Sequence, residues 1–379
     1  MKKSDLIFIF SSFIIWRIAI FIFALLSIKF LPVFSHNYFG GGYSNYTVNP
    51  LFWGHLNFDG EHYLAIAQNG YQPLEYFFFP LFTIAIRFFS LAKDQVTLVW
   101  TGLIISNLLF LFALIGIYKL VEIDYKENVA KLTLILMLFF PTSFYFATYY
   151  TESLFLILVV WAFYLARRGN FLVASILAAF ASAARVVGVV LLPVLLIEYF
   201  LKSKNKNLFV AAETILISPL GLVVYLYFLL KQPGDPLIFL HQVSIFGEQR
   251  SSTLILLPQV IYRYVFKILP HVTYYYFPNV FTTYLEFIIG ILFLALIIYG
   301  FWKLRISYSI YALLVYLVPT LAGSFSSMPR YVLVVFPVFI LVALFLSKVP
   351  RVYKYILFSV MLILLVFSTA MFWRGYWLS

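Results

Sequence analysis

A polar segment near the amino terminus carries residue types suited to acid–base chemistry. Residues 57–71 read Asn-Phe-Asp-Gly-Glu-His-Tyr-Leu-Ala-Ile-Ala-Gln-Asn-Gly-Tyr. We expect a short helix over residues 60–69, which places Asp59 at its start and His62 and Tyr63 one turn later. A carboxylate beside an imidazole can act as a general base. The same position suits a helix N-cap, and from spacing alone capping is the simpler interpretation.

Three further charged residues stand where apolar stretches meet. Glu152 lies at a turn between two apolar runs, Arg185 interrupts the run 178–192, and Arg330 begins another run. A charge at the centre of a bilayer costs about 2.5–3.5 kcal/mol on insertion scales, so each needs a partner or water. Arg185 can pair with Glu152, with Asp59 or with a ligand phosphate, because a guanidinium presents several donors in one plane. A wetted helix start for Glu152 and snorkelling of Arg185 to the interface are the alternatives.

The elements that position these residues must be helices in a membrane. Of the 379 residues, 64% are hydrophobic and only 11% are charged, and the mean hydropathy is +0.99. Because about a quarter of a soluble domain is charged, lipid must cover most of this surface. The absence of cysteine excludes disulfides and thiolate catalysis. The net charge of +12 arises from short basic clusters between apolar runs, a pattern that orients membrane proteins and does not indicate nucleic acid.

We predict an all-α polytopic membrane protein with about eleven transmembrane helices, since a span needs about 20 apolar residues. The first, residues 6–31, is too long for the core of a signal peptide and is expected to be a retained anchor. The pair 171–184 and 187–201 is short, so we expect its hairpin around Arg185 to dip below the outer surface. The remaining spans are expected near residues 96–118, 131–148, 152–167, 208–230, 279–302, 306–322, 331–347 and 352–373.

The basic clusters predict the orientation. All of them fall on one side of the membrane if residues 77–92, which contain Pro80 and Arg87, form a juxtamembrane or re-entrant helix and not a span. The amino terminus is then cytoplasmic, and the two long loops, residues 32–95 and 231–277, are extracytoplasmic. We expect one membrane domain over residues 1–379, located in the cell membrane of a prokaryote or the endoplasmic reticulum of a eukaryote.

Several function classes lack support in the sequence. It contains no Gly-x-x-x-x-Gly-Lys-Ser/Thr loop for ATP and no Gly-x-Ser-x-Gly elbow of a serine hydrolase. No spacing of histidines and carboxylates marks a metal site, so we expect no cofactor and leave dependence on a divalent metal open. In the loop 231–277, bases alternate with apolar and aromatic residues, as in a helix at the headgroup layer. Those bases can also attract a lipid phosphate, although an ordinary interfacial helix is the simpler interpretation.

The motifs resemble one known family. The stretch 58–63, followed by Ile66-Ala67, Gly70-Tyr71, Glu75 and residues 78–82, resembles the PIG-V family of GT-C glycosyltransferases, which includes GPI mannosyltransferase 2 and bacterial and archaeal relatives. Residues 150–155, Ala184-Arg185 with Gly188, and Arg330-Tyr331 with Phe336-Pro337 match the same family in order. Phe58 departs from the tryptophan usual in the family, which affects packing and leaves the carboxylate in place.

The resemblance implies a GT-C-like helical bundle and an inverting enzyme. Such an enzyme takes a sugar, with mannose expected, from a polyprenyl-phosphate donor to a hydroxyl of a glycan, glycolipid or protein acceptor at the extracytoplasmic face. Asp59 is implied as the general base, and the remaining site residues are expected to bind substrate: Glu61, His62, Tyr63, Glu75, Glu152, Arg185, Arg330 and Tyr331. The alternative is a flippase or transporter of polyprenyl-linked lipid or oligosaccharide, which would place charges along a path to both faces.

Overall fold

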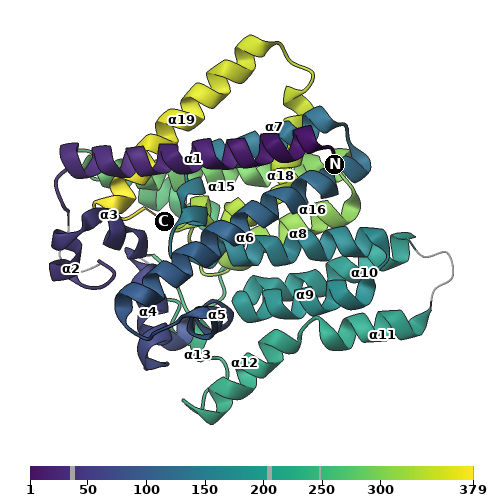
Figure 1. Ribbon diagram of the computed structural model, residues 1–379, viewed down its shortest axis with the longest axis horizontal. Helices are drawn as coiled ribbons and strands as arrows, with labels where there is room; N and C mark the ends of the chain where they lie inside the picture. The colour runs from purple at the N-terminus through teal and green to yellow at the C-terminus, as the bar shows by residue number, and fades with distance from the viewer. Residues whose placement is uncertain (35–38, 203–206, 247–248, 379) are drawn as a thin grey trace.

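The computed structural model describes residues 1–34, 39–202, 207–246 and 249–378, and these form a bundle of helices (Figure 1). Over these ranges there is no β-strand, and the one extended pairing is an isolated bridge between Ile255 and Ala322. The predicted all-α class is therefore confirmed.

Five helices in the described part of the chain are long and apolar enough to cross a membrane. They are α1 (Lys3–Phe30), α6 (Gln95–Asp124), the joined α11 (Leu208–Ile217) and α12 (Leu220–Lys231), α15 (Phe277–Lys303) and α19 (Arg351–Trp373). A sixth candidate is the pair formed by Met328–Val334 and Phe336–Leu346, whose axes bend by 79°. The protein is thus a multi-pass membrane protein, while the count of eleven spans stays a prediction.

Shorter helices occupy the other predicted spans. These are α7 (Glu127–Phe139), α8 (Glu152–Arg168), α9 (Phe171–Ala184), α10 (Leu191–Lys202) and α16 (Ile306–Thr320). Helix α7 ends before the predicted boundary because Pro141 cannot donate the next helical hydrogen bond. The chain continues from it as a 3₁₀ helix, η3 (Ser143–Ala147). Helix α8 ends at Gly169, whose φ of 94° is left-handed and suits glycine.

The first long loop folds into short helices at one end of the bundle, on the left in Figure 1. They are α2 (Tyr43–Val48), α3 (Pro50–Trp53), η1 (Gly54–Leu56), α4 (Asp59–Asn69), η2 (Glu75–Phe77) and α5 (Leu81–Phe89). The helix expected over residues 60–69 is α4. Helix α5 forms within residues 77–92, and its nine residues are too few to cross a bilayer.

The second long loop contains α13 (Ile238–His241), α14 (Leu257–Arg263), the π-helix η5 (Tyr264–Ile268) and η6 (Leu269–His271). Between α13 and α14, residues 249–255 cross to the turn before α17 and are called the strap below. Two hydrogen bonds hold the strap there, from Ser251 N to Ala322 O at 2.8 Å and from Ile255 N to Leu321 O at 2.9 Å.

Helix α8 lies at the centre of the packing, between α6 and α9, while α1 packs on α19 and α7 on α18 (Phe336–Leu346). The first residue of α8 and the ends of its neighbours therefore come together at one end of the bundle. That end also receives α4, the strap and the short α17 (Met328–Tyr331) followed by η7 (Val332–Val334).

Candidate active site

The backbone before Asp59 is anchored on both sides. Asn57 is fully buried and donates from Nδ2 to the carbonyl of Phe372 at 2.8 Å, while its own carbonyl accepts from Tyr150 Oη at 2.5 Å. Phe58 adopts a φ of 61°, a strained value for a residue with a side chain. Its ring packs edge-on against Trp377, with the ring centroids 5.2 Å apart. These contacts fix where α4 begins and hence where the Asp59 carboxylate points.

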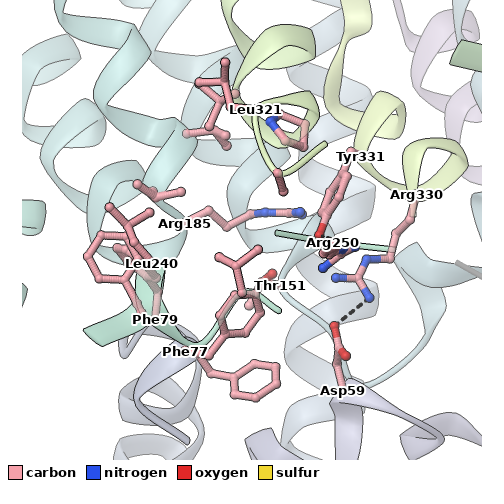
Figure 2. Close-up of a pocket in the computed structure, with 18 of the residues that line it drawn as sticks. Asp59, Phe77, Phe79, Thr151, Arg185, Leu240, Arg250, Leu321, Arg330 and Tyr331 are labelled. Carbon is pink, nitrogen blue, oxygen red and sulfur yellow. Dashed lines mark hydrogen bonds and ion pairs between the residues drawn. The ribbon is translucent and has the colours of Figure 1, made fainter. Parts of the chain in front are cut away.

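Asp59 does not cap α4. Phe58 is the N-cap residue, and Asp59 is the first residue inside the helix. Its Oδ2 lies 2.6 Å from Nη1 of Arg330 (Figure 2). The capping interpretation is therefore wrong, because the carboxylate is committed to a guanidinium from the other end of the chain and not to the amides of its own helix.

Glu152 links two arginines behind Asp59. It is the first residue of α8 and completely buried, and its Oε1 lies 2.9 Å from Nη1 of Arg185 and 3.1 Å from Nε of Arg330. Its second oxygen has no hydrogen-bond partner among the described residues. Of the partners expected for Arg185, the structure thus shows Glu152, and a continuous chain of ion pairs runs from Asp59 to Arg185.

The local backbone conformation directs the side chains of Arg185 and Arg330 toward the cavity. Arg185 ends α9 in an extended conformation, with φ of −157°, before the 3₁₀ helix η4 (Val186–Val190). Arg330 lies in α17 after Ser327, whose φ of 66° is left-handed. The amide of Ser327 donates to Glu286 Oε1 at 3.2 Å, and the hydroxyl of Thr142 donates to the carbonyl of Pro329 at 2.6 Å. Two buried hydrogen bonds therefore hold the turn that carries Arg330.

These charges face a cavity of about 390 Å³. One end carries Asp59, Arg185, Arg330 and Tyr331, and Figure 2 shows their side chains directed toward one another. The remaining wall is largely apolar and comes from the first loop, the second loop, η4 and α16. Its members include Phe77, Phe79, Val187, Leu240, Val318 and Leu321. The cavity therefore suits a ligand with an anionic group at one end and an apolar portion at the other.

The electrostatics keep Asp59 ionised. Desolvation by burial acts to raise the pKa of Asp59, but the charge and hydrogen bond of Arg330 offset it, so the pKa lies below its usual value. Burial, with Asp59 as the second cause, raises the pKa of Glu61 to about 7. Burial lowers the pKa of His62, an effect that Asp59 opposes. At neutral pH the base candidate is thus a carboxylate beside a neutral imidazole.

The other predicted residues fall into two groups. Tyr63 lines the cavity beside Asp59. Glu61 and His62 lie at its rim and outside its lining, with His62 Nε2 3.8 Å from Glu61 Oε1 and the imidazole stacked on Phe78. Glu75 is also outside the lining, and its carboxylate accepts from the amide of Gln72 at 2.8 Å. A substrate-binding role for Glu61, His62 and Glu75 stays a prediction.

Arg250 lines the cavity, and it is one of the bases of the loop 231–277 for which the sequence left open attraction of a lipid phosphate or a place in an ordinary interfacial helix. It lies on the strap, and its guanidinium is 5.7 Å from the centre of the Tyr331 ring. The sequence does not separate Arg250 from the other bases of this loop, in which apolar and basic residues are mixed. As for metals, the described residues contain no group of three or more His, Asp or Glu side chains placed to hold an ion.

The structure thus places a charged pocket inside a bundle of apolar helices. The chain belongs to the family Mannosyltransferase (PIG-V), whose model matches residues 7–371. The resemblance to the PIG-V family drawn from the motifs is thereby confirmed. No curated protein matches this sequence.

Solved structures of the Archaeoglobus fulgidus oligosaccharyltransferase are similar in fold. The apo form shares 14% identity at a TM-score of 0.45, covering 95% of this chain and 56% of that chain. The complex with zinc and sulfate shares 15% identity at a TM-score of 0.46, covering 95% and 53%. The complex with an inhibitory peptide and a dolichol-phosphate shares 13% at 0.43, covering 96% and 56%. The chain spans little more than half the length of these proteins.

Proposed function

We propose that this glycosyltransferase moves mannose from a polyprenyl-phosphate donor to a hydroxyl acceptor with inversion at the anomeric carbon, and that Asp59 is the general base. One observation carries the proposal: an ionised carboxylate shares a single cavity with guanidinium groups and an apolar wall. The base and the groups that stabilise a departing phosphate are then within reach of one substrate.

The chemistry balances with these residues alone. The acceptor oxygen forms a bond to the anomeric carbon as the bond from that carbon to the phosphate oxygen breaks. Asp59 takes the proton of the acceptor hydroxyl. The phosphate leaves with the bonding electrons, and its charge is stabilised by Arg185 and Arg330. Glu152, bound to both arginines, holds them in place during the transfer.

The charge count supports a donor with a single phosphate. Three guanidinium groups, those of Arg185, Arg250 and Arg330, face two carboxylates, Asp59 and Glu152, within the described residues. One positive charge is in excess, which one phosphodiester anion neutralises. The apolar wall suits the first isoprene units of the lipid. The acceptor, whether glycan, glycolipid or protein, would approach from the rim formed by Glu61 and His62.

The proposal places the site at the extracytoplasmic face of the cell membrane of a prokaryote, or of the endoplasmic reticulum of a eukaryote. The six basic clusters of the sequence support this orientation, since such clusters remain on the cytoplasmic side. A lipid-linked donor is available at that face without a nucleotide-binding domain.

The decisive experiment compares Asp59→Asn with wild type in detergent, using radiolabelled polyprenyl-phosphate mannose and scoring donor consumption. Loss of the base should lower turnover by about a hundredfold or more, in protein that remains folded at the assay temperature. Asp94→Asn is the matched control, because Asp94 is an exposed N-cap that accepts from the amide of Thr97 and lies outside the cavity. Undiminished turnover in Asp59→Asn would remove Asp59 as the base. Lipid movement without any sugar transfer by wild type would favour the flippase hypothesis.

A further inference from the structure

Arg250 is the third guanidinium of the cavity and comes from a different element than the other two. It lies on the strap, whose residues 250–254 line the cavity. Arg185 and Arg330, by contrast, are held by helices and by Glu152. Figure 2 shows all three side chains around Tyr331.

One aromatic ring gathers the three cations. The guanidinium carbons of Arg185 and Arg330 each lie 5.4 Å from the centre of the Tyr331 ring, and that of Arg250 lies 5.7 Å from it. Arg250 also donates to the Tyr331 hydroxyl at 3.2 Å and to Ser327 Oγ at 2.7 Å. Three like charges at this separation repel, and an anion between them relieves the repulsion.

Arg250 is the cation of this group that forms no direct ion pair with a carboxylate among the described residues, although its charge helps to lower the pKa of Asp59. Its hydrogen-bond acceptors there are the carbonyls of Phe246 and Ser326 and the hydroxyls of Ser327 and Tyr331. Arg185 pairs with Glu152, and Arg330 pairs with both Glu152 and Asp59. The excess positive charge of the cavity is therefore carried by Arg250.

Backbone strain marks the same position. Three non-glycine residues in the described chain have positive φ: Phe58 at 61°, Gln249 at 67° and Ser327 at 66°. Phe58 precedes Asp59, Ser327 begins the turn of Arg330, and Gln249 directly precedes Arg250. Such strain costs about 1–3 kcal/mol per residue and persists where function requires a particular aim. The segment that carries Arg250 thus has a residue with positive φ, as do the segments that carry Asp59 and Arg330.

We propose that Arg250 binds the phosphate of the lipid-linked donor. The inference rests on the proposed function, since the phosphate is that of the donor named there. Tyr331 and Ser327 hold the guanidinium in position before the donor arrives, and the phosphate completes its coordination.

The test measures direct binding, which needs no turnover. Farnesyl phosphate and farnesol are titrated into full-length protein in detergent, with tryptophan fluorescence as the readout, for wild type, Arg250→Gln and Arg250→Lys. Arg250→Gln should weaken farnesyl phosphate binding about tenfold, as expected for loss of one charge-assisted hydrogen bond, and leave farnesol binding unchanged. Arg250→Lys should recover part of the affinity.

Lys267→Gln is the matched control, because Lys267 is an exposed cation of the same loop that lies outside the cavity. It should bind both ligands as wild type does. Wild-type affinity for farnesyl phosphate in Arg250→Gln overturns the inference, as does an equal loss in Lys267→Gln. If wild type transfers no sugar yet Arg250→Gln loses phosphate affinity, the proposed function fails and the assignment of Arg250 stands. If wild type transfers sugar normally and Arg250→Gln binds farnesyl phosphate as wild type does, the proposed function stands and the assignment of Arg250 fails.

Discussion

Glu152 and Glu198 are both completely buried and both bound to arginine, yet they occupy very different settings. Glu198, on α10, accepts from Arg305 at 2.7 and 2.8 Å through its two oxygens, and also from the Ser307 hydroxyl. Arg167, at the carboxyl end of α8, lies 3.9 Å away. Glu152, at the other end of α8, shares one oxygen between two arginines and leaves the second unpartnered among the described residues.

The difference teaches what separates an ion pair inside the bundle from the pairs of the proposed site. Around Glu198 both carboxylate oxygens have hydrogen-bond partners, and neither Glu198 nor Arg305 lines the cavity. Around Glu152 the arginines face the cavity and keep donors for a ligand. Glu152 and Glu198 are alike in burial and in ion pairing, so neither property identifies the site. What identifies it is the presence, among the described residues, of hydrogen-bond donors that face a cavity and have no protein acceptor.

The largest expected effect is on stability, from Glu198→Gln. The change leaves Arg305 and Arg167 without a full counter-charge and should lower the free energy of unfolding by about 3 kcal/mol. Thermal unfolding in detergent measures the loss. Protein that remains folded at low temperature should retain most of its transferase activity. A variant with wild-type stability would break the comparison, because it would show that the Glu198 pairs are not structural.

Glu152→Gln should act mainly on turnover. The amide keeps an acceptor for Arg185, but Arg185 and Arg330 lose part of their counter-charge, so we expect a destabilisation no larger than that of Glu198→Gln, about 3 kcal/mol at most. Turnover should fall about a hundredfold, since small displacements of positioning groups cost about that much. The two variants together form the check. If Glu152→Gln unfolds more readily than Glu198→Gln and retains activity, the roles assigned to the two glutamates are reversed.

The smallest expected effect is on the pH dependence of stability, through Glu61. Burial, aided by Asp59, raises the pKa of Glu61 to about 7 from the ordinary 4.5. The folded protein therefore keeps a proton that the unfolded chain loses between pH 4.5 and 7. Stability from Glu61 is complete below pH 4.5 and declines as pH rises to 7. Glu61→Gln should raise the melting temperature by about 2 °C at pH 8 and leave it unchanged at pH 4.5. Equal shifts at both values would contradict the raised pKa.

Much of this site was accessible from the sequence, for a definite reason. Glu152, Arg185 and Arg330 interrupt apolar stretches, where a charge is costly, so each one signals a partner or a ligand. Asp59 lacked that contrast, because it lies in a polar loop where capping was the simpler interpretation. The family resemblance, and not the spacing, pointed to the catalytic role proposed for it.

The parts that escaped prediction depend on contacts between distant segments. Arg250 is one base among several in its loop, and only the bonds of the strap to Leu321 and Ala322 bring it to the cavity. Glu198 also interrupts an apolar run, so the rule that marks Glu152 marks it equally. Only its pairing with Arg305, 107 residues further along the chain, separates the two glutamates. No local rule makes that distinction.

The anchoring of Asn57 has a consequence for biosynthesis. Asn57 donates to the carbonyls of Phe372 and Trp373, more than 300 residues further along the chain, and Tyr145 donates to the carbonyl of Leu378. A nascent chain can insert its first helices long before residues 372–378 leave the ribosome. The loop that carries Asp59 then waits for those residues before it reaches its final conformation. A translation product released before residue 372 would thus be a membrane-inserted protein whose Asp59 loop lacks these contacts.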